Sequence, residues 1–455
     1  MKRSGASTAI VAALFVVGLI IGAAGVYAFT STSSKTTTIT SGAATTTVTT
    51  PGGTVTLSGG GGANLGTVTI GVLTDLTSTL SSEGGRVQAY AEQAATDLNT
   101  WVATTQWAGK VTFKVSVVDY ALNPTTADQE LKAFAASGVS VVVGPLNSGA
   151  ASAIMGDANK LNVVLISPSS TSPALAIPND YLFRTAPDDV YQGQADATMM
   201  YSNGVRGLII VYRDDTYGAG LYNYTSADFN TAGGSGVTVD AIPYSSTATS
   251  FTNILPTINN DYQNLVSKYG ANAVAIDAIS FEELGYLLTE AKASYPSLLT
   301  TPQPWYGTDG ENGDTALTNS TYGSLMQSIR MAATVFGYDN TSKTLSVCRD
   351  FTNPSLSCDS YALGAYDDVW LGALSILDCG ANSGSCVQQV LPSVAANYFG
   401  VTGWTALNAA GDRNGGDFQI GCVEPAPAAA NWYLCGGWSA TSNSVTWVSG
   451  MQPST

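Results

Sequence analysis

The segment Val143-Gly144-Pro145-Leu146-Asn147-Ser148-Gly149 joins an apolar run, 139–143, to a predicted helix at 150–160. The apolar run predicts a buried strand, and the Gly-Pro pair ends it. Ser148 then stands at the start of the helix, where its hydroxyl can cap free backbone N–H groups. The same hydroxyl can instead donate to a ligand carboxylate beside the positive end of the helix. The segment therefore predicts a strand–loop–helix unit with a polar side chain in its loop.

Strands and helices alternate on both sides of this segment. We expect a first series of strands at 67–72, 111–118, 139–143 and 163–166, with helices at 86–101, 126–136 and 150–160. A second series follows, with helices at 190–201, 220–229, 253–268 and 281–293 and strands at 207–212, 237–241 and 273–276. This alternation predicts an α/β fold with parallel sheets, built as two doubly wound Rossmann-like lobes. Residues 182–187 end at Pro187, and residues before a proline favour an extended backbone. We expect this segment to form the first crossing of a hinge between the two lobes.

Ligands of open α/β sheets bind beyond the carboxyl ends of the strands, which selects a few loops. One of them, 166–173, places Ser169 and Thr171 among other hydroxyl residues between two prolines. Hydroxyls and carbonyls in such a rigid loop can hold a zwitterion, although an ordinary polar loop has the same composition. Asp309 follows the aromatic pair at 305–306 and is either the partner of a ligand ammonium or a solvated turn residue.

Composition excludes several classes of function. The 455 residues carry a formal charge of −16, and only 11% of them are charged. A negative field repels nucleic-acid backbones, and no basic stripe is present, so we expect no nucleic-acid partner. Histidine is absent, which removes the commonest general base and the commonest metal ligand. A surface with so few charges changes little on acidification, and we interpret it as an adaptation to an acidic or otherwise harsh exterior.

The first 29 residues predict a membrane anchor. Lys2 and Arg3 precede 21 uncharged residues, 9–29, which span about 31 Å as a helix and match a hydrocarbon core of about 30 Å. Basic residues that flank a membrane helix favour the cytoplasmic side, so we expect residues 30–455 to lie outside the cell. A cleaved secretory signal is the alternative. Processing after Gly5 is another, because this flank resembles the prepilin-like signals of some archaeal surface binding proteins, which suggests an archaeal chain.

Between the anchor and the lobes, residues 30–62 are rich in Ser, Thr and Gly and predict a flexible linker. The ligand-binding domain then occupies 63–455. We assign 63–186 and part of 330–400 to lobe 1, and 187–325 and the C-terminal part to lobe 2. Glycosylation motifs at Asn223, Asn319 and Asn340 agree with a surface location.

Six cysteines lie in the last quarter of the chain, and an even number outside the cell predicts disulfides. Fifteen connectivities are possible. The simplest joins sequence neighbours, namely Cys348 with Cys358, Cys379 with Cys386, and Cys422 with Cys435. We expect no metal and no cofactor, because no CxxC spacing occurs and the acidic segment 311–314 lacks the closing Glu of a calcium loop.

In order and spacing, a series of motifs between residues 66 and 422 resembles the branched-chain amino-acid-binding family of importer receptors. They are the stretches 71–79, 90–99, 118–124, 144–148, 167–171, 183–185, 217–221, 307–310, 366–371 and 403–412. The resemblance implies a type I periplasmic-binding fold. It also implies partners, namely the permease and ATP-hydrolysing subunits of an ABC importer.

The same resemblance assigns roles to individual residues. Ser148 and Thr171 become donors to the ligand carboxylate, Ser169 a backbone contact to its ammonium, and Asp309 the counter-ion, while Tyr217 closes over the ligand. Ser280 and Glu83 stand where some members have aromatic residues that line the side-chain pocket. These departures favour a small polar ligand, such as an amino acid or related amide, over a purely aliphatic one.

We therefore expect a monomeric solute-binding domain that is not an enzyme. A surface sensor is a rival reading, but it needs an output domain. A structural surface protein is another. Adjacent acid pairs such as Asp367-Asp368 could suggest a glycosidase, but neighbours in sequence rarely face each other across a substrate.

Overall fold

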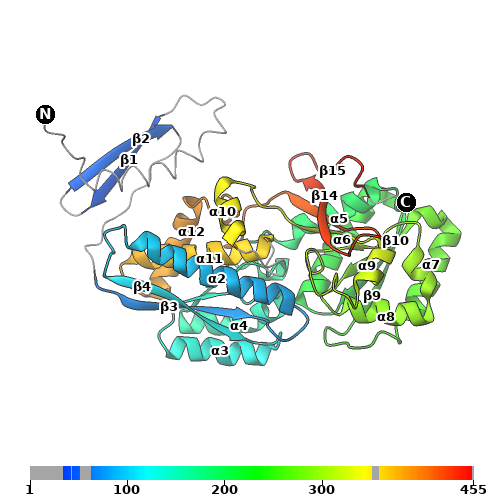
Figure 1. Ribbon diagram of the computed structural model, residues 1–455, viewed down its shortest axis with the longest axis horizontal. Coiled ribbons are helices and arrows are strands. Elements are labelled where there is room, and N and C mark those ends of the chain that lie inside the picture. Colours follow the sequence, from blue (N-terminus) through cyan, green and yellow to red (C-terminus); the bar gives the residue numbers. More distant parts are fainter. Residues whose placement is uncertain (1–33, 42–43, 52–62, 351–357, 453–455) are drawn as a thin grey trace.

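The computed structural model describes residues 34–41, 44–51, 63–350 and 358–452. It contains two α/β lobes that lie side by side (Figure 1). We call the five-stranded sheet with its helices lobe 1, and the eight-stranded sheet with its helices lobe 2. The α/β class and the parallel sheets predicted from the sequence are confirmed.

Lobe 1 has a fully parallel sheet of order β4-β3-β5-β6-β7. Such a sheet is covered on both faces, which explains why its central strands are apolar throughout. The strands are β3 (Gly66–Thr74), β4 (Val111–Asp119), β5 (Val141–Val143), β6 (Val164–Ser167) and β7 (Leu182–Arg184). The helices are α2 (Ser81–Val102), α3 (Pro124–Ala136), α4 (Ser148–Leu161), α11 (Ser360–Cys379) and α12 (Gly384–Ala396).

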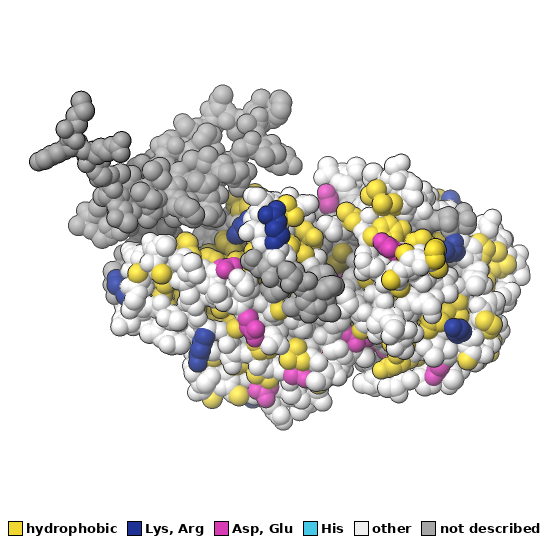
Figure 2. Space-filling view, in the orientation of Figure 1, with side chains coloured by type: hydrophobic (Ala, Val, Ile, Leu, Met, Phe, Trp, Pro, Cys, Tyr) yellow, Lys and Arg dark blue, Asp and Glu magenta, His cyan; other side chains and the backbone are white. Residues whose placement is uncertain are grey.

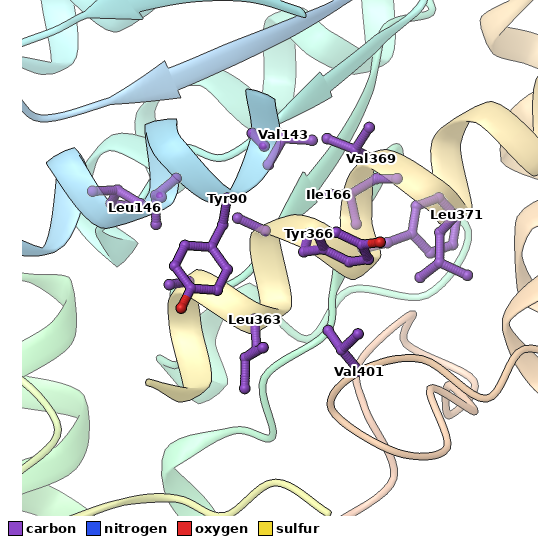
Figure 3. Close-up of a cluster of buried hydrophobic side chains, with 14 of the residues drawn as sticks. Tyr90, Val143, Leu146, Ile166, Leu363, Tyr366, Val369, Leu371 and Val401 are labelled. Carbon is purple, nitrogen blue, oxygen red and sulfur yellow. The ribbon is translucent and has the colours of Figure 1, made fainter. Parts of the chain in front are cut away.

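Helix α11 returns from far along the chain to complete the core of lobe 1. It is buried on almost every face, as expected of a helix that is apolar all round. Figure 3 shows Leu363, Tyr366 and Val369 of α11 beside Tyr90 of α2 and Val143 of β5. The Tyr366 hydroxyl donates to Asp97 of α2 at 2.8 Å, which fixes the two helices against each other.

Lobe 2 has a mixed sheet of order β15-β14-β13-β12-β11-β10-β8-β9. Strands β8 to β12 are parallel, and β8, β9 and β10 are the strands predicted there. The parallel strands β11 and β12 and the antiparallel strands β13, β14 and β15 were not predicted. The strands are β8 (Gly207–Arg213), β9 (Thr238–Tyr244), β10 (Val274–Ile279), β11 (Tyr306–Gly307), β12 (Ala332–Phe336), β13 (Phe418–Val423), β14 (Trp432–Ser439) and β15 (Ser444–Trp447). The helices are α5 (Asp189–Ser202), α6 (Thr216–Gly233), α7 (Leu255–Tyr269), α8 (Leu284–Ser294) and α9 (Gly323–Ile329), and α10 (Ser342–Asp350) follows β12.

The chain passes between the lobes after β7, after β12 and after α12. Buried polar contacts join these passages. Arg184 at the end of β7 pairs with Asp412 on the third passage, with Nε 2.5 Å from Oδ1 and both side chains almost fully buried. The Thr185 hydroxyl donates to Asp368 of α11 at 2.6 Å. The crossing predicted at 182–187 is thus fixed to the third passage by an ion pair and to α11 of lobe 1 by a hydrogen bond.

Three disulfides join the sequence neighbours, as the simplest connectivity predicted. Cys348 pairs with Cys358, Cys379 at the end of α11 pairs with Cys386 of α12, and Cys422 of β13 pairs with Cys435 of β14.

The segment 30–62, predicted as a linker, contains secondary structure. Within it, β1 (Ser34–Ser41) and β2 (Ala44–Pro51) form an antiparallel hairpin, which Figure 1 shows apart from the two lobes. Both strands are rich in Thr, and β-branched residues favour extended pairing even in a low-complexity segment.

The predicted anchor at 1–29 lies outside the described residues. Among the helices that the structure describes, none combines the length and the apolarity that a membrane crossing requires.

Charged side chains are sparse on the molecular surface that Figure 2 shows. On this face, Lys, Arg, Asp and Glu side chains are few and scattered among uncharged ones. Asn223, Asn319 and Asn340, the predicted glycosylation sites, are all exposed, so each is accessible to modification.

Candidate functional site

A cavity lies where the carboxyl ends of the strands in the two sheets approach each other. It encloses about 460 Å³ of space not filled by protein atoms, counting the part open to solvent. Lobe 1 lines it with Glu83, Arg86, Ser148, Ser169 and Tyr361, and lobe 2 with Tyr217, Phe281 and Asp309 among others. Five of the seven predicted ligand-binding residues therefore lie at one cavity.

One interpretation of the sequence placed Ser148 as the cap of its helix, and the structure does not support it. The N-cap is Asn147, and Ser148 is the first residue of α4. The Ser148 hydroxyl oxygen accepts instead from the backbone N–H groups of Thr171 (3.2 Å) and Ser172 (3.1 Å), so it fixes the neighbouring loop. A positive φ of 101° at Gly144 and a close approach to the Leu73 carbonyl make this tight loop possible, because a Cβ at Gly144 would lie 2.3 Å from that oxygen.

The loop after β6 contributes Ser169 to the cavity but holds Thr171 behind it. Ser169 lines the cavity, and its hydroxyl donates to the Leu146 carbonyl at 2.8 Å. Thr171 is 2% exposed and is not one of the lining residues. Its backbone carbonyl accepts from the N–H of Asp189 at the start of α5, so this loop contacts both lobes.

Asp309 is held by a phenol from each lobe. Tyr217 of α6 donates to Oδ1 at 2.7 Å, and Tyr361 of α11 donates to Oδ2 at 2.5 Å. Burial raises the pKa of Asp309, and the two phenolic hydrogen bonds oppose this by stabilising the carboxylate. Tyr361 was not singled out from the sequence, because nothing there indicates that the start of α11 reaches the second lobe. A buried carboxylate between two hydroxyl donors is suited to receive an ammonium group.

Phe281, and not Ser280, lines the cavity on the side of lobe 2. The Ser280 side chain points elsewhere, because its hydroxyl donates to Glu311. Phe281 stacks on Tyr217 with ring centroids 5.4 Å apart, and the Arg213 guanidinium lies over its other side at 3.7 Å. Ion pairs of Arg213 with Asp215 and Glu283, each at 2.7 Å, fix this aromatic wall.

Glu83 belongs to a charged cluster at the cavity. Arg86 pairs with Glu83 and with Asp359, each at 2.5 Å, and is 1% exposed. Burial and the neighbouring Asp359 raise the pKa of Glu83 to about 8, although Arg86 acts in the opposite direction. Gly84 lets α2 begin here, because a Cβ at this residue would lie 1.6 Å from the Asp75 carbonyl oxygen.

The lobes touch at the rim of the cavity. Glu282 of lobe 2 accepts from the Ser82 N–H at 2.9 Å and from the Ser81 hydroxyl at 3.3 Å, and its own N–H donates to the Thr79 carbonyl at 3.0 Å. The hydroxyls of Ser82 and Thr315 are hydrogen-bonded at 3.0 Å. The two lobes are thus closed against each other over the cavity.

No metal-binding group of three or more acidic, His or Cys side chains occurs within residues 63–350 and 358–452. In the segment that faintly resembles a calcium loop, Glu311 accepts from the backbone N–H groups of Ser280 (2.6 Å) and Thr308 (2.9 Å). Its carboxylate therefore shapes the loop that carries Asp309.

Two sequence relatives place the chain in a wider context. An uncharacterised protein of Methanocaldococcus jannaschii is 27% identical over 405 residues, which cover 85% of this chain and 93% of that protein. Glutamate receptor 2.8 of Arabidopsis thaliana is 40% identical over 87 residues, which cover 19% of this chain and 9% of the receptor.

Solved structures share the fold across most of the chain. A leucine-binding protein from Thermotoga maritima has a TM-score of 0.68 at 16% identity, covering 82% of this chain and 99% of that one. A branched-chain amino acid transporter substrate-binding protein from Streptococcus pneumoniae, in complex with isoleucine, has a TM-score of 0.64 at 20% identity, covering 81% and 99%. An ABC transporter substrate-binding protein from Desulfitobacterium hafniense, in complex with Leu, has a TM-score of 0.60 at 20% identity, covering 81% and 100%.

These neighbours are binding proteins of the type I periplasmic-binding fold, as the sequence motifs implied. The model of the receptor family ligand binding region matches residues 103–424, which is well over half of the chain. The protein therefore belongs to the receptor family of ligand-binding regions, with the fold of the branched-chain amino-acid-binding proteins.

Proposed function

We propose that this protein is the extracytoplasmic solute-binding subunit of an ABC importer and that it captures an amino acid or a related amide between its two lobes. The observation that carries the proposal is the cavity between the lobes, where Asp309 lies between the hydroxyls of Tyr217 and Tyr361. An α-ammonium bound to Asp309 would be held from both lobes at once. Ligand binding would then stabilise the closed arrangement, as a population shift requires.

The other end of an amino acid finds partners in lobe 1. Ser148 and Ser169 line the cavity close to the N-terminus of α4, where the helix dipole favours a carboxylate. We assign the ligand carboxylate to this corner, where Thr171 supports Ser148 from behind through the hydrogen bond of its backbone N–H. In this proposal the protein acts as a monomer, performs no catalysis, and presents the closed form to permease subunits in the membrane, to which residues 1–29 anchor it.

A thermal-shift experiment tests the binding step. The purified chain is unfolded, dialysed to remove any ligand it carries, refolded, and then heated with a panel of amino acids, amides and small peptides. We expect at least one compound to raise the melting temperature, because a ligand that binds only the folded state stabilises it. Mass spectrometry of ligand released before refolding identifies the natural compound.

The variant Asp309→Ala should lose this stabilisation, whereas Asp214→Ala should keep it, since Asp214 is an exposed carboxylate on the same lobe. The proposal fails if no compound in the panel shifts the melting temperature. It also fails if Asp309→Ala binds the stabilising compound as tightly as the unaltered chain.

A further inference from the structure

The walls of the cavity carry more negative than positive charge. Glu83, Asp309 and Asp314 line it, and Arg86 is the cation among the described residues that line it. Asp359 lies behind Arg86 and adds a further carboxylate. Burial raises the pKa of Asp314 to about 6, so this group still ionises near neutral pH. Without a ligand, burial of so many carboxyl groups favours their protonated forms, and this raises the pKa of Glu83 and of Asp314; a bound cation would favour their ionised forms.

Arg86 is already engaged by two carboxylates of lobe 1. Its Nη2 donates to Glu83 Oε2 at 2.5 Å, and its Nε faces Asp359 at 2.5 Å. Its Nη1 donates to the Ser82 hydroxyl at 3.1 Å and toward the Gly313 carbonyl at 3.4 Å. A ligand with an acidic side chain would therefore meet carboxylates here, beside a guanidinium whose charge Glu83 and Asp359 already offset.

Glu83 has an acceptor left. Its Oε1 is buried and forms no hydrogen bond within the part of the chain that the structure describes, while Oε2 faces Arg86. The charged and titratable groups that face Glu83 are Arg86 and Tyr90 of its own helix, Asp359 and Tyr361 from the start of α11, and Asp314 from the loop after β11. A buried acceptor without a donor destabilises the protein until a ligand supplies one.

We propose that the ligand is an α-amino acid whose side chain ends in a positive charge, and that Glu83 Oε1 receives that end. This inference rests on the amino-acid-binding function proposed above and names its substrate class. A neutral amide would satisfy the free acceptor, but only a cation also offsets the surplus of carboxylates at this end of the cavity. Asp309 and Ser148 would then hold the α-ammonium and the α-carboxylate, while Glu83 distinguishes basic side chains from aliphatic ones.

Calorimetric titration of the full, refolded chain with matched ligands tests this specificity. The probes are L-lysine, L-ornithine and L-arginine, with L-norleucine as the uncharged analogue of lysine, and L-leucine, L-glutamine and L-glutamate. We expect the tightest basic amino acid to bind at least 30-fold more tightly than norleucine, and glutamate to bind most weakly. Leucine or norleucine binding as tightly as every basic probe would overturn this inference and leave the proposed function intact. Binding by none of the probes would overturn this inference, and the wider thermal-shift panel would then decide the proposed function.

The isosteric variant Glu83→Gln isolates the charge, because its amide oxygen can still accept from Arg86. We expect it to weaken binding of the basic amino acid at least tenfold and to change norleucine binding less than threefold. Glu92→Gln, on the exposed face of the same helix, should leave both affinities unchanged. A Glu83→Gln variant that weakens both ligands equally would assign Glu83 a purely structural role and contradict the proposal. If Glu83→Gln fails to fold, the ratio of lysine to norleucine affinity in the unaltered chain still decides whether the site prefers a basic side chain.

Discussion

Tyr361 is the side chain that connects lobe 1 directly to the carboxylate at the centre of the candidate site. Its hydroxyl donates to Asp309, and its ring is 5% exposed. Replacing it by Phe removes one donor to a buried carboxylate and keeps the packing. Hydrogen bonds to charged groups contribute about 1.5–3 kcal/mol. We expect Tyr361→Phe to weaken ligand binding about tenfold or more, measured by calorimetry with the compound identified in the thermal-shift panel.

Tyr181→Phe provides the matched control, because its hydroxyl donates at 2.7 Å to Asn162, away from the cavity. Its ligand affinity should equal that of the unaltered chain. Equal affinities for Tyr361→Phe and the unaltered chain would mean that closure does not depend on the contact between Tyr361 and Asp309.

The sequence predicts that residues directly after strands meet at the candidate site, but it does not predict which residues within helices reach the same site. Ser148, Ser169 and Asp309 each come shortly after a strand, and the carboxyl ends of parallel strands share one edge of a sheet. Arg86 and Tyr361 lie within helices whose sequences show only burial. Their approach to the cavity depends on how α2 and α11 pack together, which no local pattern encodes.

At the scale of elements, the ion pair of Arg184 and Asp412 ties β7 to the last passage between the lobes. Neither side chain is more than 2% exposed. Asp412→Asn would leave the guanidinium buried without its charge partner, and breaking such a pair costs about 3–5 kcal/mol. We therefore expect a clear fall in the free energy of unfolding, measured by urea titration.

An exposed ion pair gives the comparison. Asp157 contacts Lys132 and Lys160 at 2.8 and 2.7 Å, and both lysine side chains are largely exposed. Asp157→Asn should lower the free energy of unfolding far less than Asp412→Asn, because water screens ion pairs with exposed lysines. If Asp412→Asn and Asp157→Asn lowered the free energy of unfolding equally, burial would not be what makes the pair of Arg184 and Asp412 stabilising.

The predicted strands and helices up to α8 are confirmed because apolar runs of four to nine residues alternate with amphipathic segments there. Strands β13 to β15 were missed, since Gly421, Gly436 and Gly437 interrupt the apolar pattern that marks a strand. The antiparallel edge depends on pairing between β12 and β13, which are more than 80 residues apart in the chain, and not on local propensity.

At the scale of the whole molecule, buried carboxyls replace histidine as the groups that titrate near neutral pH. Burial is the first cause of each shift. It raises the pKa of Glu83 to about 8, of Asp277 and Glu282 to about 7, and of Asp180 and Asp314 to about 6. Each group binds its proton more tightly in the folded chain than in the unfolded one. These groups therefore stabilise the fold most in acid, and the contribution is lost as pH rises from about 4 through 8.

We expect the melting temperature to be higher at pH 5 than at pH 8 in buffers of equal ionic strength. Asp119 and Asp157 have lowered pKa values and act in the opposite direction, but both are only partly buried, so solvent screening makes their influence smaller. Asp277→Asn removes one buried acid and should flatten the profile between pH 4 and pH 7. A melting temperature that peaks near neutrality and collapses by pH 4 would contradict this prediction and the interpretation of an acidic exterior.

The contacts of Glu282 with Thr79, Ser81 and Ser82 have a consequence for the speed of binding. These contacts hold the lobes together at the rim of the cavity that contains Asp309, so we expect them to separate before a ligand enters. In stopped-flow experiments, the observed rate should then rise with ligand concentration and level off at the opening rate. Glu282→Ala should raise that plateau, whereas a rate that stays linear in concentration would mean that the rim does not delay entry. Uptake from a rich medium would accordingly be timed by the motion of the protein and not by diffusion of its cargo.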